Sequence, residues 1–330
     1  MSVTRNALVV GGSGFIGMHL LRALKQDGRY AKVVSVDIAP PSERIDGVVY
    51  ETHDARRSLP LHLADPQTDI YNLPALRTFP GHPDDEYFET NLGTTERVIE
   101  LAEAAGARTI VFTSTMSVYA TGDERKTEDS PIDPGNAYGA SKVQGEAAHR
   151  EWLARSPDRK LVICRPAVIF GYLDNGNFTR LANALRRRYF VFVGRKDTIK
   201  SAGYVGDLVD SFLFALDTME KTGEREILYN FAYPERLTIG RIVQAFCKVG
   251  GYHEPRLVVP PKILGLAALP FEALNAVGIE NPIHRKRLQK LYEGTNIIPQ
   301  WLEDNRFEFR TDIESALAEW KAESSGGRFV

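Results

Sequence analysis

A tyrosine and a lysine four residues apart are the strongest candidates for chemistry in this chain. Tyr138 and Lys142 fall within residues 136–156, a segment predicted to form one long helix, and residues four apart share a helix face. A free phenol titrates near pH ~10, so a base at neutral pH needs its pKa lowered by roughly 3 units, or about 4 kcal/mol. A neighbouring ammonium group favours the phenolate. The spacing therefore predicts a general base, Tyr138, that Lys142 supports.

A run of hydroxyl side chains lies upstream of this pair. Residues 108–113 are rich in β-branched and aromatic side chains, which predicts a strand, and Thr113-Ser114-Thr115-Met116-Ser117 leaves its carboxyl end. Ligands collect at such strand ends in open α/β sheets. A hydroxyl here can hydrogen-bond the substrate oxygen that becomes a carbonyl and share its proton with Tyr138. The spacing leaves several of these hydroxyls open for that role.

A glycine-rich turn near the amino terminus predicts a dinucleotide site. Gly11, Gly14 and Gly17 follow an apolar strand segment at 7–10 and precede helical spacing at 18–24. Glycines let the chain turn tightly, bring backbone N–H groups close to phosphates and point a helix N-terminus at negative charge. Strand, turn and helix in this order predict a pyrophosphate cradle.

The acid at the end of the second predicted strand selects between two dinucleotides. Asp37 closes the segment 31–37, twenty residues after Gly17. In this fold an acid there accepts hydrogen bonds from the adenosine ribose hydroxyls and repels a 2′-phosphate. The sequence therefore favours NAD over NADP.

Strands that alternate with helices predict an α/β fold with a Rossmann-type, doubly wound parallel sheet. The chain of 330 residues is long enough for one large domain or two closely joined ones. The further segments expected are strands at 48–51, 68–73, 108–113 and 161–165 and helices at about 85–105 and 136–156. We expect residues 1–170 to form the NAD-binding domain, with about 200–225 returning to it. Residues 171–330, with strand candidates at 191–193 and 228–231, would form mainly a smaller, mixed substrate-binding lobe.

Composition excludes several classes of protein. A net charge of −2 gives no electrostatic case for nucleic acid. Two cysteines in unrelated contexts, Cys164 and Cys247, build neither a disulfide framework nor a zinc site, which favours the cytoplasm. The histidines have no metal-ligand spacing, so no metal is expected.

The stretch 257–279 is unusually apolar, with only Lys262 and Glu272 ionisable. Three prolines interrupt it, so no membrane span is expected. It is compatible with buried helices under the second lobe, with an apolar pocket wall or with a face that touches a membrane.

Together these motifs resemble the extended short-chain dehydrogenase/reductase superfamily, in its NAD-dependent epimerase/dehydratase group. The resemblance covers most of the chain, and its motifs are more specific in the first half. It implies that Tyr138, Lys142 and Thr115 are catalytic. The cofactor contacts that it implies are Gly11, Gly14, Phe15, Ile16, Gly17, Asp37, Asp54, Leu73, Asn91, Tyr138, Lys142, Arg165 and Val168. One departure is Asn72-Leu73-Pro74-Ala75, which stands where the family usually has His-Leu-Ala-Ala.

The resemblance also implies a substrate and a reaction. Thr115, Asn177 and Lys200 are the candidate substrate contacts, with further cations at Arg195, Lys196 and His284-Arg285-Lys286-Arg287. The cluster at 284–287 fits a solvated basic helix face better than a diphosphate contact. The leading hypothesis is an NAD-dependent epimerase of a nucleotide-diphosphate sugar, working by proton abstraction at Tyr138 and reversible hydride transfer to NAD. The alternative is a net dehydrogenase or reductase of a hydroxysteroid or other apolar alcohol. A catalytically inactive NAD sensor is a third. Family members commonly form homodimers through the helices at about 85–105 and 136–156.

Overall fold

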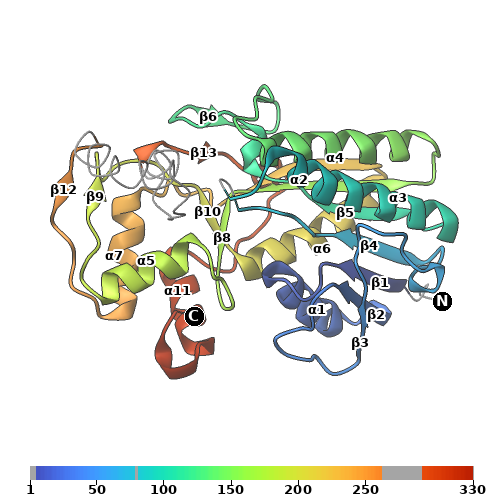
Figure 1. Cartoon of the computed structure of the whole chain (residues 1–330), viewed down its shortest axis with the longest axis horizontal. Helices are drawn as coiled ribbons and strands as arrows, with labels where there is room; N and C mark the ends of the chain where they lie inside the picture. The colour runs from blue at the N-terminus through green and yellow to red at the C-terminus, as the bar shows by residue number, and fades with distance from the viewer. Residues whose placement is uncertain (1–4, 79–80, 262–291, 330) are drawn as a thin grey trace.

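A parallel sheet of seven strands forms the centre of the molecule. The computed structural model describes residues 5–78, 81–261 and 292–329 (Figure 1). The strands lie in the order β11-β7-β5-β4-β1-β2-β3, and all neighbours are parallel. Their bounds are β1 Arg5–Val10, β2 Tyr30–Asp37, β3 Val48–Thr52, β4 Thr68–Asn72, β5 Thr109–Thr113, β7 Lys160–Pro166 and β11 Glu226–Phe231. The predicted doubly wound α/β fold is confirmed.

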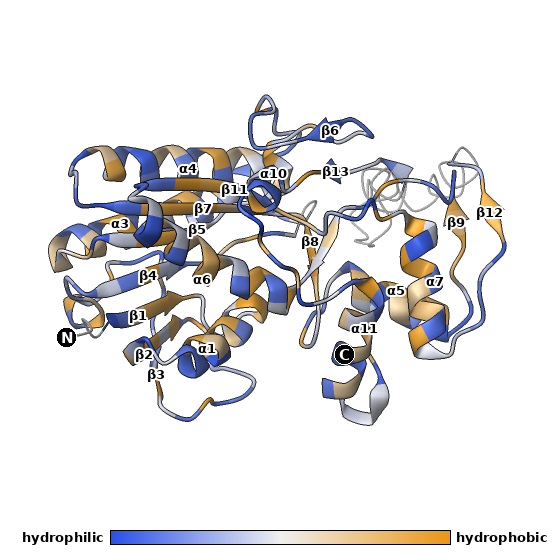
Figure 2. Cartoon of the chain, turned by 180° about the vertical axis from the view of Figure 1, so that it is seen from behind, coloured by the Kyte–Doolittle hydropathy of each residue, from blue (hydrophilic) through white to orange (hydrophobic). Residues whose placement is uncertain are grey.

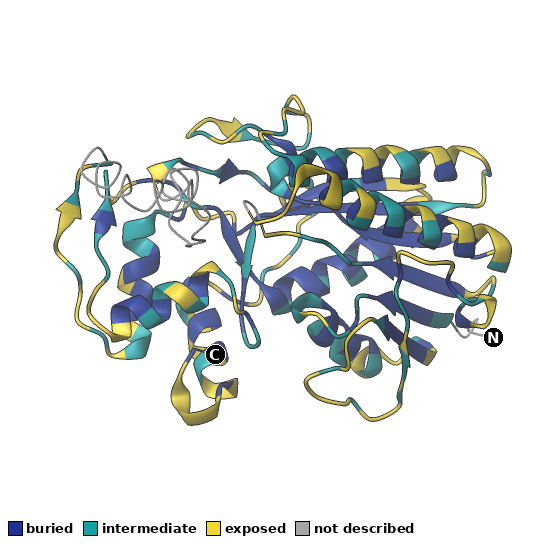
Figure 3. Cartoon of the chain, in the orientation of Figure 1, coloured by how far each residue is buried: buried dark blue, intermediate teal, exposed yellow. Residues whose placement is uncertain are grey.

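Helices cover both faces of this sheet, which explains its continuous apolar strands. On one face α1 (Phe15–Asp27) and α6 (Val205–Thr222) pack together, and their leucines share a buried cluster with β1 and β7. On the other face α3 (Gly93–Ala105) and α4 (Ala137–Ala154) enclose a second cluster. Figure 2 shows apolar residues along the central strands, and Figure 3 shows these strands buried. The layers therefore hold the carboxyl ends of β1, β4 and β5 at one fixed edge.

The helix predicted over about 85–105 is composite. It consists of α2 (Asp84–Tyr87), a π-helical turn η2 (Phe88–Leu92) and then α3. The helix predicted over 136–156 is the single helix α4, and the Asn136 side chain caps it by accepting a hydrogen bond from the Gly139 N–H at 3.0 Å.

The chain beyond residue 171 returns to the central sheet. The predicted strand at 228–231, expected in the second lobe, lies in β11, which pairs with β7 in parallel at the edge of the sheet. The helix before it, α6, packs against α1. Strand pairing joins segments far apart in the chain, so the local pattern could not show where β11 belongs.

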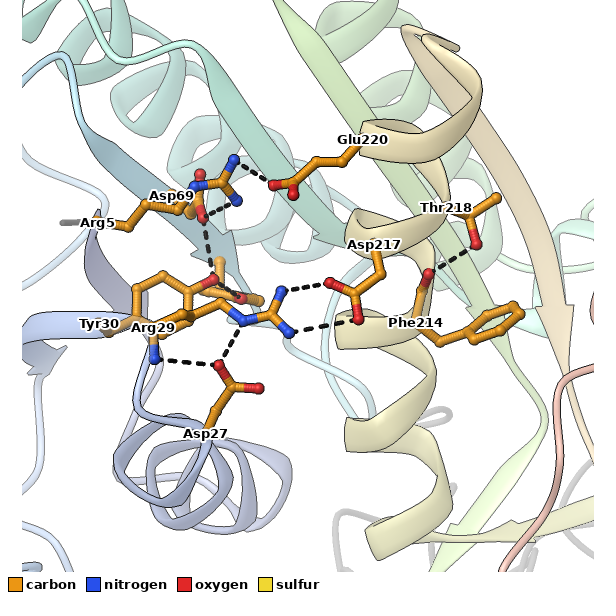
Figure 4. A network of polar contacts seen from close by, with 10 residues as sticks. Arg5, Asp27, Arg29, Tyr30, Asp69, Phe214, Asp217, Thr218 and Glu220 are labelled. Atoms are coloured by element: carbon orange, nitrogen blue, oxygen red, sulfur yellow. Dashed lines mark hydrogen bonds and ion pairs between the residues drawn. The ribbon is translucent and has the colours of Figure 1, made fainter. Parts of the chain in front are cut away.

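Ion pairs fasten this returning segment to the amino end of the sheet (Figure 4). Arg29 donates to the carboxylate of Asp217 on α6 at 2.7 Å. Asp69, buried at the start of β4, accepts from the Tyr30 hydroxyl at 3.0 Å and pairs with Arg5 at 3.3 Å. This network lies at the opposite end of the strands from the predicted site, so it stabilises the scaffold without touching the site.

The second lobe is built of short elements around an aromatic cluster. Phe170 stacks on Phe178 at 4.5 Å, and Phe246 meets Trp320 edge-on at 6.2 Å. Its helices are α5 (Asn177–Arg186), α7 (Ile239–Gly250) and α11 (Ile313–Glu323), and the 3-10 turn η4 (Ser325–Gly327) follows α11. Helix α10 (Gln300–Asp304) packs instead on β11 of the central sheet. The 3-10 turns η1 (Leu61–Leu63) and η3 (Met116–Val118) lie in the first half of the chain. The paired strands are β8 (Val168–Phe170) with β10 (Ala202–Tyr204), β9 (Phe192–Val193) with β12 (Val258–Val259), and β6 (Arg125–Lys126) with β13 (Asn296–Ile297).

The apolar stretch 257–279 and the basic cluster 284–287 fall largely outside the described residues, which include only 257–261 of them. Among the described residues, no helix is long and apolar enough to cross a membrane.

Candidate active site

Lys142 lies fully buried where α4 meets the ends of β4 and β5. Its ammonium donates to the Thr113 carbonyl at 2.8 Å and the Pro74 carbonyl at 3.4 Å, and it lies 4.7 Å from the Phe112 ring centroid. Burial lowers the pKa of Lys142 to about 7, and the carboxylate of Glu146 opposes this shift. The structure thus holds an amine that titrates near neutrality at the carboxyl edge of the sheet.

Tyr138 lies one helical turn before Lys142 on the same helix and is half-buried. Burial raises the pKa of its phenol, while a hydrogen bond with the Thr115 side chain and the nearby charge of Arg77 act in the opposite direction. A close approach of backbones allows this placement, because a Cβ on Gly139 would lie 2.1 Å from the Ser117 carbonyl oxygen. The structure therefore brings together Tyr138, Lys142 and Thr115, as the sequence predicts.

The hydroxyl side chains at the end of β5 have different hydrogen-bond partners. Ser114 donates its hydroxyl to Glu146 at 2.6 Å, so it is committed within the protein. Thr115 accepts the Ser117 N–H at 3.1 Å and still contacts Tyr138. Thr113 Oγ1 is buried and, within the described part of the chain, lacks a hydrogen-bond partner. Of the hydroxyls left open by the spacing, Thr115 is the one that the structure places against the phenol.

Glu146 is a buried group of this site that the sequence analysis missed. Its carboxylate accepts two hydrogen bonds from Arg165, at 2.8 and 2.6 Å, and the ion pair is almost fully buried. Arg165 also donates to the Tyr119 hydroxyl at 2.8 Å. The Arg165 guanidinium, predicted to contact the cofactor, is therefore engaged with protein groups. The four-residue spacing from Lys142 was the available signal for Glu146.

His149 continues the same buried helix face. Its Nδ1 hydrogen-bonds the Gly145 carbonyl at 2.7 Å, and its ring stacks on Phe112 at 4.3 Å. Asn72 lies 3.4 Å from Nε2. Burial lowers the pKa of His149 to about 4, and the charge of Lys142 adds to this shift. Asn72, which departs from the usual family residue, thus has a buried histidine as its neighbour.

The glycine turn has the shape of a phosphate cradle. Gly11 adopts φ +80°, and a Cβ there would meet Pro74 at 3.1 Å. A Cβ on Gly17 would lie 2.4 Å from the Gly11 carbonyl oxygen, so only glycine lets α1 approach the turn so closely. Gly14 begins α1 without a side-chain cap, which leaves the first N–H groups of the helix for a ligand. Phe15 and Ile16 lie in this first turn and pack against the core of the second lobe.

Asp37 lies beside this turn at the end of β2. One carboxylate oxygen accepts the Ser13 N–H at 3.0 Å, and the other accepts the Ala39 N–H at 3.2 Å. These bonds fix the carboxylate between the glycine turn and the loop after β2. This is the position from which an acid binds an adenosine ribose.

The remaining predicted cofactor contacts line this edge with different partners. Asp54 follows β3 and pairs with Arg56 at 2.8 Å, which lowers the pKa of Asp54 to about 2. Leu73 continues β4 and donates its N–H to Val10 at 3.2 Å. Asn91 is buried and bridges Leu76, at 2.7 Å, and Ser141. Val168 is half-buried at the start of β8.

The predicted substrate contacts beyond Thr115 lie in the second lobe. Asn177 is exposed at the first turn of α5. Lys200 donates to the Glu293 carbonyl at 2.5 Å, and burial lowers its pKa to about 8. Arg195 pairs with Asp123, and Lys196 lies over the Phe192 ring.

Arg77 is a second residue that the sequence analysis missed. It lies in the loop after β4 and donates to Asn175 Oδ1 at 3.0 Å, which links the two lobes near α5. Its charge acts on both Tyr138 and Asp174. The departure from the family pattern at Asn72-Leu73-Pro74-Ala75, just before Arg77, was the available signal that this loop is distinctive.

These residues fit a dinucleotide. The cradle that a Cβ would fill, the uncapped helix N-terminus and the acid at the end of β2 lie at one edge of the sheet, with Tyr138 and Lys142 at the same edge. Fold and site together define a Rossmann-type protein with the tyrosine–lysine pair of a short-chain oxidoreductase. A family model described as NAD dependent epimerase/dehydratase family matches residues 7–232. The chain belongs to this family, which confirms the resemblance.

Similar proteins match this chain along most of their length. The chain is 30% identical over 297 residues to the N-acetyl-alpha-D-glucosaminyl-diphospho-ditrans,octacis-undecaprenol 4-epimerase of Escherichia coli O157:H7, covering 88% of this chain and 86% of the relative. It is 26% identical over 310 residues to UDP-glucose 4-epimerase 2 of Oryza sativa subsp. japonica, covering 81% and 74%. The structure of MoeE5 in complex with UDP-glucuronic acid and NAD has a TM-score of 0.73, at 22% identity, over 96% of this chain and 99% of that chain.

Proposed function

We propose that this protein is an NAD-dependent epimerase of a sugar joined to a diphosphate, with nucleotide-diphosphate sugars as the first substrates to test. The observation that carries the proposal is the meeting of Thr115, Tyr138 and Lys142 at the carboxyl edge of the sheet, beside the glycine cradle. The first-listed relatives act, by their names, on diphosphate-linked hexoses, which supports the same substrate class.

Tyr138 takes the proton of a sugar hydroxyl in this mechanism, and Thr115 orients that hydroxyl. Lys142 lies one helical turn away, and its positive charge favours the phenolate. Arg77 adds a second positive charge on the phenol. NAD, when bound, supplies the acceptor and donor of hydride. The protein supplies position and electrostatics, which are what a cofactor enzyme contributes.

NAD would be held by the glycine turn, by Asp37 and by Lys142, with the segment that begins at Val168 along the nicotinamide. Asn177 and Lys200 would hold the sugar diphosphate from the second lobe. Residues 1–170, with 200–225 and the strand β11 that follows, then serve as the cofactor domain, and the rest of 171–330 serves mainly as the substrate lobe. We place the enzyme in the cytoplasm, since Cys164 and Cys247 are both free and buried, and propose a homodimer through α3 and α4.

The test is the fate of NAD. An epimerase releases no free NADH while it interconverts two UDP-hexoses, and mass spectrometry should find NAD in the purified protein. Incubation with UDP-glucose or UDP-N-acetylglucosamine, followed by chromatography of the products, measures the interconversion. Stoichiometric NADH formation with a hydroxysteroid or another apolar alcohol, and no change of either sugar, would instead establish the alternative dehydrogenase.

A further inference from the structure

The tip of the second lobe exposes large apolar side chains to solvent. Tyr189 and Leu257 are each 61% exposed, and Val258 is 39% exposed. They lie around the strand pair β9–β12, at the end of the molecule farthest from the central sheet (Figure 1). Figure 2 shows β12 as hydrophobic, and Figure 3 shows it partly exposed, with Val258 exposed and Val259 of intermediate exposure. An apolar ribbon in contact with water requires an explanation.

The strand pairing places Leu257 and Val258 beside Phe192. Val258 lies opposite Phe192 in the parallel pair, and the Phe192 N–H donates to the Leu257 carbonyl at 2.9 Å. Tyr189 precedes Phe192 by three residues. Successive residues of an extended chain point to opposite faces. Exposure of both Leu257 and Val258 therefore means that, among the described residues, nothing covers either face at the start of β12.

Exposed arginines flank the exposed apolar residues along the chain. Arg186, Arg187 and Arg188 end α5, Arg256 directly precedes Leu257, and all four are exposed. Cations at a helix C-terminus favour the helix dipole, but Arg256 lies on no helix. Across the described ranges, no carboxylate forms an ion pair with Arg187, Arg188 or Arg256. The tip is therefore a local positive patch on a chain whose net charge is −2.

We propose that this patch, the membrane tip (Arg186–Tyr189 and Arg256–Val258), docks the protein on an anionic lipid bilayer. Basic side chains among exposed aromatic and aliphatic ones are the composition that binds the headgroup boundary of such a membrane. A two-fold contact between copies would place these arginines against their own equivalents. A nucleic acid would satisfy the arginines but leave Leu257 and Val258 in water.

Docking also indicates how a substrate reaches the site, a step that rests on the proposed function. Helix α5 begins at Asn177, the candidate substrate contact, and ends at the membrane tip. Its ten residues span about 15 Å. A sugar diphosphate anchored in the bilayer by a lipid would thus be presented one helix length from the second-lobe contact. The E. coli relative, by its name, acts on such a lipid-linked sugar.

Co-sedimentation of the NAD-loaded protein with vesicles tests the proposal. We expect binding to vesicles of equal parts phosphatidylglycerol and phosphatidylcholine, and much weaker binding to pure phosphatidylcholine or in 0.5 M salt. Arg186→Gln, Arg187→Gln and Arg188→Gln together should lower the partition coefficient at least about tenfold. Leu257→Ser with Val258→Thr should lower it without changing the salt dependence.

A matched control removes one exposed apolar and one exposed basic side chain from the cofactor domain. Leu61→Ser with Lys32→Ala should bind vesicles like the unmodified protein. Circular dichroism and bound NAD should be equal in all variants, so that unfolding does not imitate lost docking. Equal sedimentation with both lipids, or unaffected binding by both tip variants, would overturn the proposal. So would a dimer in ultracentrifugation that the tip variants dissociate.

Vesicle binding is measured without turnover, so it separates docking from the proposed epimerase. If the protein binds vesicles but epimerises no sugar, the membrane-docking proposal stands and the proposed function is wrong. If the protein epimerises UDP-sugars but never binds vesicles, the proposed function stands and the membrane-docking proposal is wrong.

Discussion

Tyr138 is held between opposing influences on its proton. Burial favours the neutral phenol, whereas the Thr115 hydroxyl and the charge of Arg77 favour the phenolate. Burial also favours the neutral form of Lys142, which would not stabilise the phenolate. The negative charge of Glu146 opposes this effect by favouring the protonated lysine. The proposed base therefore depends on neighbours from three separate segments: the end of β5, the loop after β4 and α4 itself.

Tyr138→Phe should lower kcat at least about 10²-fold, because it removes the hydroxyl of the proposed general base. The melting temperature should change little, since the ring and its packing remain. Initial rates of sugar interconversion and a thermal melt measure the two effects. Tyr292→Phe, an exposed tyrosine of the second lobe, is the control and should turn over normally. Unchanged turnover in Tyr138→Phe would remove Tyr138 from the mechanism.

Helix α4 is the element that organises the site. Lys142, Glu146 and His149 are buried along one face of it, and the half-buried Tyr138 lies one turn before Lys142. A single helix therefore positions the proposed base, its cation and the carboxylate behind them. The Glu146–Arg165 pair fastens this helix to β7. A buried pair of this kind is strongly destabilising when one partner is removed.

Glu146→Gln should lower the free energy of unfolding by about 3 kcal/mol, because it leaves the Arg165 charge buried without a carboxylate. Urea denaturation measures the change. Glu146→Gln with Arg165→Met should recover most of it, since the charge is gone. Glu103→Gln, which breaks the surface pairs of one carboxylate with Arg155 and Arg159, should cost less than about 1 kcal/mol. Fully additive losses in the double variant would show that the two side chains are not coupled.

The glycine turn supplies the element-scale test of the cradle. Gly17→Ala should lower stability by about 1–3 kcal/mol and weaken NAD binding, because its Cβ would meet the Gly11 carbonyl oxygen at 2.4 Å and push α1 away. Gly93→Ala at the start of α3, where a Cβ meets nothing within 4 Å, should be neutral or stabilising by up to about 1 kcal/mol. Equal effects of the two changes would contradict the close approach. Chemical denaturation and NAD titration measure both.

The stability of the whole molecule should depend on pH through its buried histidines. His149 has a pKa of about 4 in the folded state, against an ordinary value of 6.5. The unfolded chain therefore binds the proton first, and stability falls as pH decreases from about 6.5 toward 4. His19, with a folded-state pKa also lowered to about 4, acts in the same direction.

His149→Gln should remove about 2 kcal/mol of the stability difference between pH 7.5 and pH 5. Urea denaturation at both values measures this. The exposed His62→Gln serves as the matched change and should leave the slope as it is. If the pH slope of His149→Gln equals that of the unmodified chain, the neutral buried histidine is excluded as its source.

The cofactor cradle and the reactive pair could be predicted because their signals are local. Gly11, Gly14 and Gly17 form one turn, and Tyr138 and Lys142 lie one helical turn apart. Asp37 required only that a strand end there. The site residues beyond them were harder to predict, because Arg77, Glu146 and His149 acquire their roles from residues distant along the chain.

The sequence by itself determined the fold class, the dinucleotide turn and the tyrosine–lysine pair through periodicity and spacing, and it indicated the family through the resemblance of its motifs. Only the tertiary structure decided that β11 completes the central sheet and that Leu257 and Val258 are exposed. It also decided that Ser114 donates to Glu146 whereas Thr115 contacts Tyr138. Each of these depends on which distant segments meet. Strand pairing, burial and charge partners arise between segments, and no local pattern contains them.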